Sequence, residues 1–214
     1  MFPTVETRWF YPGPIPPDVL AWYHYGERAP EAQPTRIDYY LRLPGHDDLG
    51  IKLREGRIEI KQRAEQYGVE HLHERVHGLV EGWRKWSFGV NDMGNGLSDL
   101  AGPRPSWIAV RKARRLRRYL VSDTGEVVAI AGAEIAPQGC NIELAEITLH
   151  GEPWWSLAFE TFGPEAVLHT TFTRVTRHVL RGDTVPHLDA THSYGYAQWM
   201  ETALERSNVE TTLE

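Results

Sequence analysis

The stretch LGIKLREGRIEIKQR, from Leu49 to Arg63, decides the fold that this sequence predicts. It consists of two short runs of alternating apolar and charged residues, joined at Glu55-Gly56. Successive side chains of a strand point to opposite faces, so each run has one apolar and one charged face. In an ordinary half-buried hairpin the charged face contacts water, but the one-sided charge here favours a binding surface. The two charged faces carry Lys52 and Arg54, and then Glu59, Lys61 and Arg63.

Basic residues are concentrated in two pieces of an acidic chain. The 214 residues have a formal charge of -6, with 23 Lys and Arg against 29 Asp and Glu. The pieces from Lys52 to Arg63 and from Arg104 to Arg118 together hold 12 of the 23 basic residues and only 2 of the 29 acidic ones. Such clustering predicts a positive site, suited to a nucleic acid or to a small polyphosphate.

Length and composition place the chain among globular proteins. With 41% hydrophobic residues it can bury a full core, and we expect a single domain over residues 1–214. No apolar run approaches the roughly 20 residues needed to cross a bilayer, and the N-terminus does not resemble a secretion signal, so we expect no membrane partner and a cytoplasmic location. Cys140 is the only cysteine, which excludes an intrachain disulfide and a thiolate zinc cluster.

Most of the chain reads as strands. Alternating or β-branched runs predict strands over 4–11, 36–43, 106–122, 126–135 and 141–149, while 154–162 stays unassigned. Helices are predicted after Pro16-Pro17-Asp18, over 164–180, and over 193–206 with Ser193 as the cap. Glu65 to Trp86 carries apolar residues at helical spacing and predicts a further helix, followed by a Gly- and Asn-rich loop from Ser87 to Pro105. We interpret residues 65–105 as a helix-plus-loop insertion.

A series of motifs resembles the CYTH superfamily, the triphosphate tunnel metalloenzymes, which include class IV adenylate cyclases and thiamine triphosphatases. The opening TVETRWF is similar to the family's E-x-E-x-K motif, and the later motifs follow in the family's order. These are IDYYL (37–41), IKLR (51–54), IEIKQR (58–63), VRKARR (110–115), NIELAEI (141–147) and HSYGYAQWM (192–200).

The resemblance implies an α+β fold, a closed eight-stranded antiparallel β tunnel with flanking helices. Basic side chains of its lumen would bind a nucleoside triphosphate, thiamine triphosphate or tripolyphosphate, and carboxylates would hold Mg²⁺ or Mn²⁺. A closed barrel points every second residue inward, so its strands can supply both the basic phosphate ligands and the carboxylate metal ligands. The implied phosphate ligands are Lys52, Arg54, Lys61, Arg63, Lys112 and Arg114. The implied metal ligands are Glu6, Glu59 and Glu143, and the implied catalytic residues are Glu6 and Arg8.

The sequence departs from the family motif in its first strand. Thr4 and Arg8 stand where the family has Glu and Lys, so only Glu6 remains of two carboxylates. Arg8 can bind phosphate but cannot act as a general base. From the resemblance as a whole, metal-dependent hydrolysis of a triphosphate is our leading hypothesis. The departures in the first strand support the alternative, a catalytically impaired protein that only binds an anion. A cyclase is less favoured, as is an RNA-binding module, because aromatic residues do not alternate with the basic ones.

One motif is typical of zinc enzymes and not of phosphate binding. His73-Glu74-Arg75-Val76-His77 is H-E-x-x-H on the predicted helix, a spacing that would place two histidines one turn apart to bind zinc. Because the motif is short and the chain has 10 histidines, we treat a zinc hydrolase as a minor hypothesis beside a solvated helical face.

Overall fold

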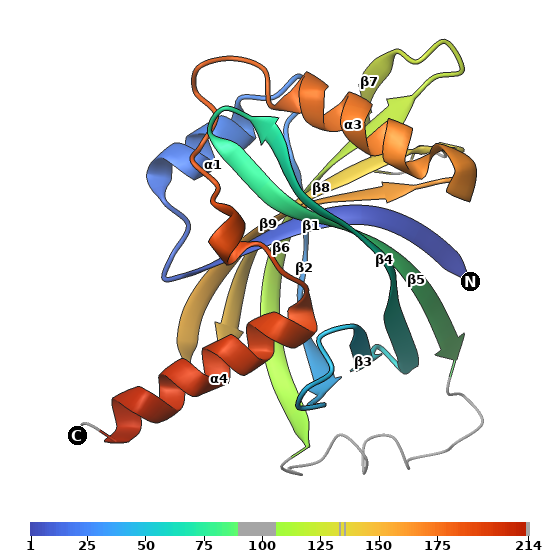
Figure 1. Cartoon of the computed structure of the whole chain (residues 1–214). Helices are drawn as coiled ribbons and strands as arrows, with labels where there is room; N and C mark the ends of the chain where they lie inside the picture. The colour runs from blue at the N-terminus through green and yellow to red at the C-terminus, as the bar shows by residue number, and fades with distance from the viewer. Residues whose placement is uncertain (90–105, 133, 135, 213–214) are drawn as a thin grey trace.

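The sheet closes into a barrel (Figure 1). The structure, a computed structural model, describes residues 1–89, 106–132, 134 and 136–212, with the side chains of α4 described to Arg206. In these ranges nine strands form one antiparallel sheet in the order β2-β3-β4-β5-β1-β9-β8-β6-β7. The strands are β1 (Phe2–Pro12), β2 (Glu31–Leu41), β3 (Leu49–Arg54), β4 (Arg57–His73), β5 (Val76–Gly89), β6 (Trp107–Val121), β7 (Val127–Ile130), β8 (Gly139–Leu149) and β9 (Glu152–Phe162).

A second pairing of β2 closes the ring. This strand pairs with β3 on one side and with β6 on the other, so eight strands form the barrel and β7 extends β6 outside it. Closure satisfies the backbone groups of both strands that would otherwise be sheet edges. The expected α+β fold, a closed eight-stranded antiparallel tunnel with flanking helices, is confirmed.

The hairpin from Leu49 to Arg63 forms as predicted. Its strands are β3 and the first part of β4, with Lys52 paired to Glu59 across the ladder. The turn is Glu55-Gly56, where both residues have positive φ, 47° and 70°. Two left-handed residues match the twist of a tight hairpin, which explains why a glycine follows the glutamate.

Helices cover the outer wall and one end of the barrel. They are α1 (Pro17–His24), η1 (Glu165–Val167), α3 (Leu168–Val179), η2 (Ala190–His192) and α4 (Tyr196–Thr212). On the outside, α1 and α3 bury Tyr23 and Phe172 against β1, β8 and β9. Helix α4 lies at the other end (Figure 1), where it inserts Trp199 into an aromatic cluster. The ring centroids of Trp199 and Phe10 are 4.9 Å apart. No helix in the described part of the chain is long and apolar enough to span a membrane.

The helix predicted over Glu65 to Trp86 is wrong, because these residues form most of the long β4–β5 hairpin. Pairing of β5 with β1 buries alternate residues of the segment, and this overrides the helical spacing of its apolar residues. Packing at Gly78 is consistent with the strand: a Cβ there would lie 2.4 Å from Trp9 Cζ2, so the Trp9 indole lies closer to the β5 backbone than a larger residue would permit. Residues 90–105 of the predicted loop lie outside the described residues.

Two further boundaries differ from the prediction. The segment 154–162, left unassigned, lies in β9 between β1 and β8. The last helix begins at Tyr196, and Ser193 does not cap it. Instead, the Ser193 hydroxyl accepts a hydrogen bond of 2.8 Å from the backbone N–H of Leu79, which attaches the chain before α4 to β5.

Candidate anion-binding site

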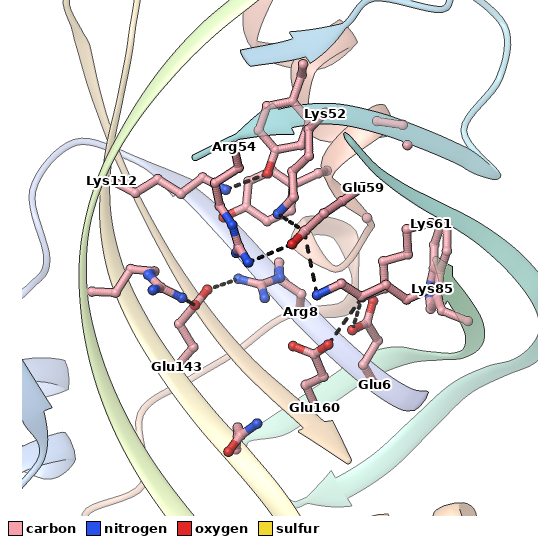
Figure 2. Close-up of a pocket in the computed structure, with 18 of the residues that line it drawn as sticks. Glu6, Arg8, Lys52, Arg54, Glu59, Lys61, Lys85, Lys112, Glu143 and Glu160 are labelled. Carbon is pink, nitrogen blue, oxygen red and sulfur yellow. Dashed lines mark hydrogen bonds and ion pairs between the residues drawn. The ribbon is translucent and has the colours of Figure 1, made fainter. Parts of the chain in front are cut away.

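A charged cavity of about 270 Å³ lies inside the barrel (Figure 2). Its walls come from strands β1 to β6, β8 and β9, and the start of α4 covers it with Gly195, Tyr196 and Ala197. The polar side chains reach the lumen because each occupies an alternate position of its strand, while the residues between them pack outward. The uncharged lining is completed by Tyr40, Gly50, Trp83 and Asn141.

Positive charge is in excess in this cavity. The eight basic lining residues are Arg8, Arg36, Lys52, Arg54, Lys61, Lys85, Lys112 and Arg114, and the four acidic ones are Glu6, Glu59, Glu143 and Glu160. By formal charge the lining therefore has four more basic than acidic residues, in a protein whose formal charge is -6, and the buried Asp38 beside Arg36, Lys52 and Lys112 offsets one of them. Five basic residues of the two basic pieces, together with Arg8, Arg36 and Lys85, line this one cavity.

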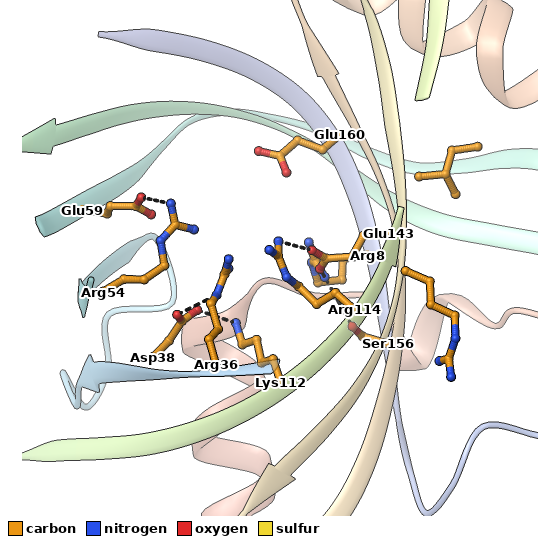
Figure 3. A network of polar contacts seen from close by, with 12 residues as sticks. Arg8, Arg36, Asp38, Arg54, Glu59, Lys112, Arg114, Glu143, Ser156 and Glu160 are labelled. Atoms are coloured by element: carbon orange, nitrogen blue, oxygen red, sulfur yellow. Dashed lines mark hydrogen bonds and ion pairs between the residues drawn. The ribbon is translucent and has the colours of Figure 1, made fainter. Parts of the chain in front are cut away.

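Glu143 links two of the arginines. Its Oε1 accepts a hydrogen bond of 2.7 Å from Arg8 Nη1, and its Oε2 accepts one of 3.1 Å from Arg114 Nη1 (Figure 3). Burial by itself raises the pKa of this carboxyl, but the two guanidinium groups outweigh burial and hold the pKa of Glu143 well below its usual range. The carboxylate stays charged, and it fixes the direction in which both arginines point.

Glu59 organises a second group at the hairpin. Its carboxylate lies 3.0 Å from Lys52 Nζ and 2.6 Å from Arg54 Nη2, and Lys85 Nζ approaches it to 3.5 Å (Figure 2). Three cations share one carboxylate here, so the group keeps a net positive charge. Such a group can accept an anion without first losing an ion pair.

A buried pair lies at the side of the cavity formed by β2 and β6. Lys112 is 3% exposed, and its Nζ donates a hydrogen bond of 2.6 Å to the Tyr40 hydroxyl and lies 3.3 Å from Asp38 Oδ2 (Figure 3). The same ammonium lies 3.6 Å from the ring centroid of Tyr196, a cation–π contact that ties α4 to the site. Burial outweighs the attraction of Asp38 and lowers the pKa of Lys112 to about 7. Burial, with the charge of Lys112, also lowers the pKa of Lys52 to about 8.

Glu6 and Glu160 face each other across neighbouring strands. They are paired residues in the β1–β9 ladder, and Lys61 Nζ lies 2.6 Å from Glu6 Oε2 and 3.6 Å from Glu160 Oε1. Burial raises the pKa of Glu6, whereas the charge of Lys61 lowers the pKa of Glu160. The two carboxyls therefore differ in acidity although they share one lysine.

The structure brings together most of the residues singled out in the sequence. The lining contains Glu6, Arg8, Lys52, Arg54, Glu59, Lys61, Lys112, Arg114 and Glu143. Arg63 is placed elsewhere: it pairs with Glu81 at 2.9 Å and Asp47 at 3.1 Å and is not among the described lining residues. On β6, Arg114 lines the cavity, whereas the next residue, Arg115, pairs outside it with Glu146.

Three charged lining residues escaped the sequence analysis. Lys85 lay in the segment predicted as a helix, and Glu160 lay in the unassigned segment. Arg36 began a predicted strand, and its spacing from Asp38 and Tyr40 placed all three on one face, which was a usable signal. The acidic partner of Lys61 on β9 could not be found without the strand pairing.

The H-E-x-x-H motif lies away from this cavity and not on a helix. His73 ends β4, Glu74 and Arg75 form the turn, and Val76 begins β5. In the hairpin His77 pairs with His71 and not with His73, so the helical spacing that the zinc hypothesis required is absent from these residues.

The carboxylates of the cavity do not fit a divalent metal site. Glu6, Glu59 and Glu143 each contact one or more ammonium or guanidinium groups, and the described residues contain no cluster of three or more His, Cys, Asp or Glu able to hold a metal ion. Mg²⁺ and Mn²⁺ need several oxygen ligands converging at short range, which these separately paired carboxylates do not supply.

Comparison of this chain with known proteins gives one weak structural likeness and no match in sequence. The sequence matches no protein-family model and no curated protein. Among solved structures, the chain is similar to a protein from Bacillus halodurans described as a "putative adenylate cyclase", at 13% identity and a TM-score of 0.36. The match covers 89% of this chain and 95% of that one. So weak a likeness assigns no ligand or activity.

Proposed function

We propose that the barrel binds a small phosphorylated anion with several negative charges, such as tripolyphosphate or the triphosphate group of a nucleotide or of thiamine triphosphate. The observation that carries the proposal is the excess of basic over acidic side chains in one cavity inside the barrel, eight against four. A buried excess of one sign is costly to maintain, and a counter-charged ligand offsets that cost. The acidic charge of the remaining surface makes a nucleic acid a poor partner.

The types of basic residue support this choice of ligand. Arg8 and Arg114 each contact Glu143 through Nη1, which leaves the other N–H groups of the guanidinium without a bond to that carboxylate. Planar guanidinium groups bind phosphate oxygens in pairs. Lys52 and Lys85 supply ammonium groups from neighbouring walls. Donors from many strands can surround a chain of phosphates, whereas a single phosphate would leave most of them without a partner.

The size of the cavity favours the phosphate chain over an organic group. Pockets for drug-sized molecules have volumes of about 300–1,000 Å³, so a cavity of about 270 Å³ is at the lower limit. We infer that the phosphates occupy the cavity and that any base or thiazole group attached to them lies toward its opening.

Hydrolysis of the same anion is the second candidate function. Glu6 and Glu160 lie side by side in the cavity, and their pKa values are displaced in opposite directions. Two carboxyls of unequal acidity are a common arrangement for acid–base catalysis. Phosphate release from tripolyphosphate, thiamine triphosphate and ATP tests this function, and binding without turnover would leave the protein as a binder only.

Calorimetry with a matched pair of variants tests the binding proposal. Arg114 and Arg115 are consecutive on β6, but the first lines the cavity and the second pairs with Glu146 outside. Arg114→Ala should weaken tripolyphosphate binding at least about tenfold, the effect of losing one charge-assisted hydrogen bond, and Arg115→Ala should leave it unchanged. Equal affinities of the two variants, or no binding by the natural protein, would refute the proposal.

A further inference from the structure

Three glutamates lie on one rung of the barrel, where a divalent cation would be expected. Glu6 on β1 is paired with Glu81 on β5 and with Glu160 on β9, so the three Cα positions follow one another across adjacent strands. Paired residues of neighbouring strands point to the same face; Glu6 and Glu160 line the cavity, and Glu81 is buried beside them against Arg63. Without compensation, three carboxylates so placed would repel one another and attract a metal ion.

Basic side chains from β4 already compensate all three carboxylates. Lys61 Nζ lies between Glu6 and Glu160, at 2.6 Å and 3.6 Å, and Arg63 Nη1 donates to Glu81 at 2.9 Å. The Lys61 ammonium is in the place that a cation shared by Glu6 and Glu160 would occupy (Figure 2). A metal ion bound there would have to displace this half-buried lysine.

The neighbouring residues of β1 also disfavour a metal ion at this position. Thr4 and Arg8 lie two residues to either side of Glu6 on the same face. Thr4 offers a neutral hydroxyl, and Arg8 adds a positive charge that would repel a metal ion. Burial lowers the pKa of Lys61, but the charges of Glu160 and Glu6 outweigh it and leave the pKa raised, so the ammonium stays charged.

We infer that Lys61 takes the place of a divalent cation, and that the barrel binds its anion in the metal-free form. The inference rests on the proposed function and specifies its ligand: an anion without Mg²⁺ carries more negative charge and matches the positive lining better than a Mg²⁺ complex. Lys61 Nζ donates a hydrogen bond of 2.6 Å to Glu6 and lies 3.6 Å from Glu160, and because the side chain lines the cavity its ammonium is also available to the ligand.

Calorimetric titration of the whole protein with tripolyphosphate, in EDTA and in excess MgCl₂, tests the ligand form. We expect binding in EDTA and equal or weaker binding with Mg²⁺. Binding that Mg²⁺ strengthens about tenfold or more would overturn the inference and leave the proposed function standing. Absence of binding under both conditions would instead refute both.

Electron paramagnetic resonance with Mn²⁺ alone tests the position of Lys61 without any anion. The natural protein should bind no Mn²⁺ at micromolar concentration, whereas Lys61→Gln should gain one Mn²⁺ that the added change Glu160→Gln removes. Circular dichroism confirms that each variant is folded. One Mn²⁺ bound by the natural protein and lost in Glu160→Gln would overturn the inference, as would a folded Lys61→Gln protein that gains none.

Discussion

Anion binding should weaken steeply as the pH rises from 6 to 9, because Lys112 loses its charge within this range. Its pKa in the free protein is lowered to about 7 by burial, and Asp38, Arg36, Arg8 and Glu143 are the charged groups that act on it. A negatively charged ligand beside the ammonium favours its protonated form. Binding is therefore accompanied by proton uptake whenever the free lysine is neutral.

The magnitude follows from the pKa values. A lysine with a pKa of about 7 that must be charged in the complex reduces the affinity about tenfold for each pH unit above 7, or about a hundredfold by pH 9. Lys52, with a pKa of about 8, adds roughly another tenfold by pH 9. At pH 8 the two lysines together should take up about 1.4 protons for each anion bound, and at pH 6 almost none.

Calorimetry in buffers of different ionisation enthalpy measures both quantities. Tripolyphosphate gains negative charge over the same range, which works in the opposite direction, so sulfate, whose charge is constant from pH 6 to 9, serves as the control ligand. Sulfate affinity that is constant with pH, together with no proton uptake at pH 8, would show that both lysines stay charged in the cavity and would refute the reasoning.

Three further predictions concern stability. Gly78→Ala should destabilise the protein by about 1–3 kcal/mol in urea denaturation, because the new methyl group would clash with Trp9. Trp199→Ala should cost about 3–5 kcal/mol in the same assay, since the indole is fully buried where α4 closes the barrel. The free energy of unfolding should rise between about pH 7 and pH 10, because Lys52 and Lys112 bind fewer protons in the folded protein than in the unfolded chain, where the lysine pKa is 10.5.

Matched controls separate these effects from general sensitivity to substitution. Gly50→Ala should cost much less than Gly78→Ala, since the nearest atom to its Cβ, the carbonyl oxygen of Lys61, is 3.9 Å away. Phe88→Ala removes an aromatic side chain that is 52% exposed, and it should cost under about 1 kcal/mol. Equal losses within either pair would contradict the packing described for the barrel.

Local patterns in the sequence predicted much of the wall of the barrel. The β3–β4 hairpin has strict alternation and a turn with a suitable glycine, so the periodicity of two determined which of its charges share a face, whereas on β6 basic residues occupy both faces. The resemblance to the CYTH superfamily, and not the alternation alone, then singled out Lys52, Lys61, Lys112 and Arg114 as expected phosphate ligands. Reasoning from periodicity failed at Glu65 to Trp86, where apolar residues fit both periods and pairing with β1 selected the strand.

The sequence by itself determined the kinds of charge, their concentration in two strand-forming pieces and their alternation along each strand, because these depend only on neighbouring residues. Tertiary structure alone decided which charges meet. Lys61 lies 55 positions from Glu6 in the chain, and Glu160 is more distant still. Only closure of the β1–β9 and β4–β5 pairings brings these three side chains within an ion pair's reach. Barrel register, a property of long-range backbone hydrogen bonds, therefore placed a lysine where a metal ion was expected.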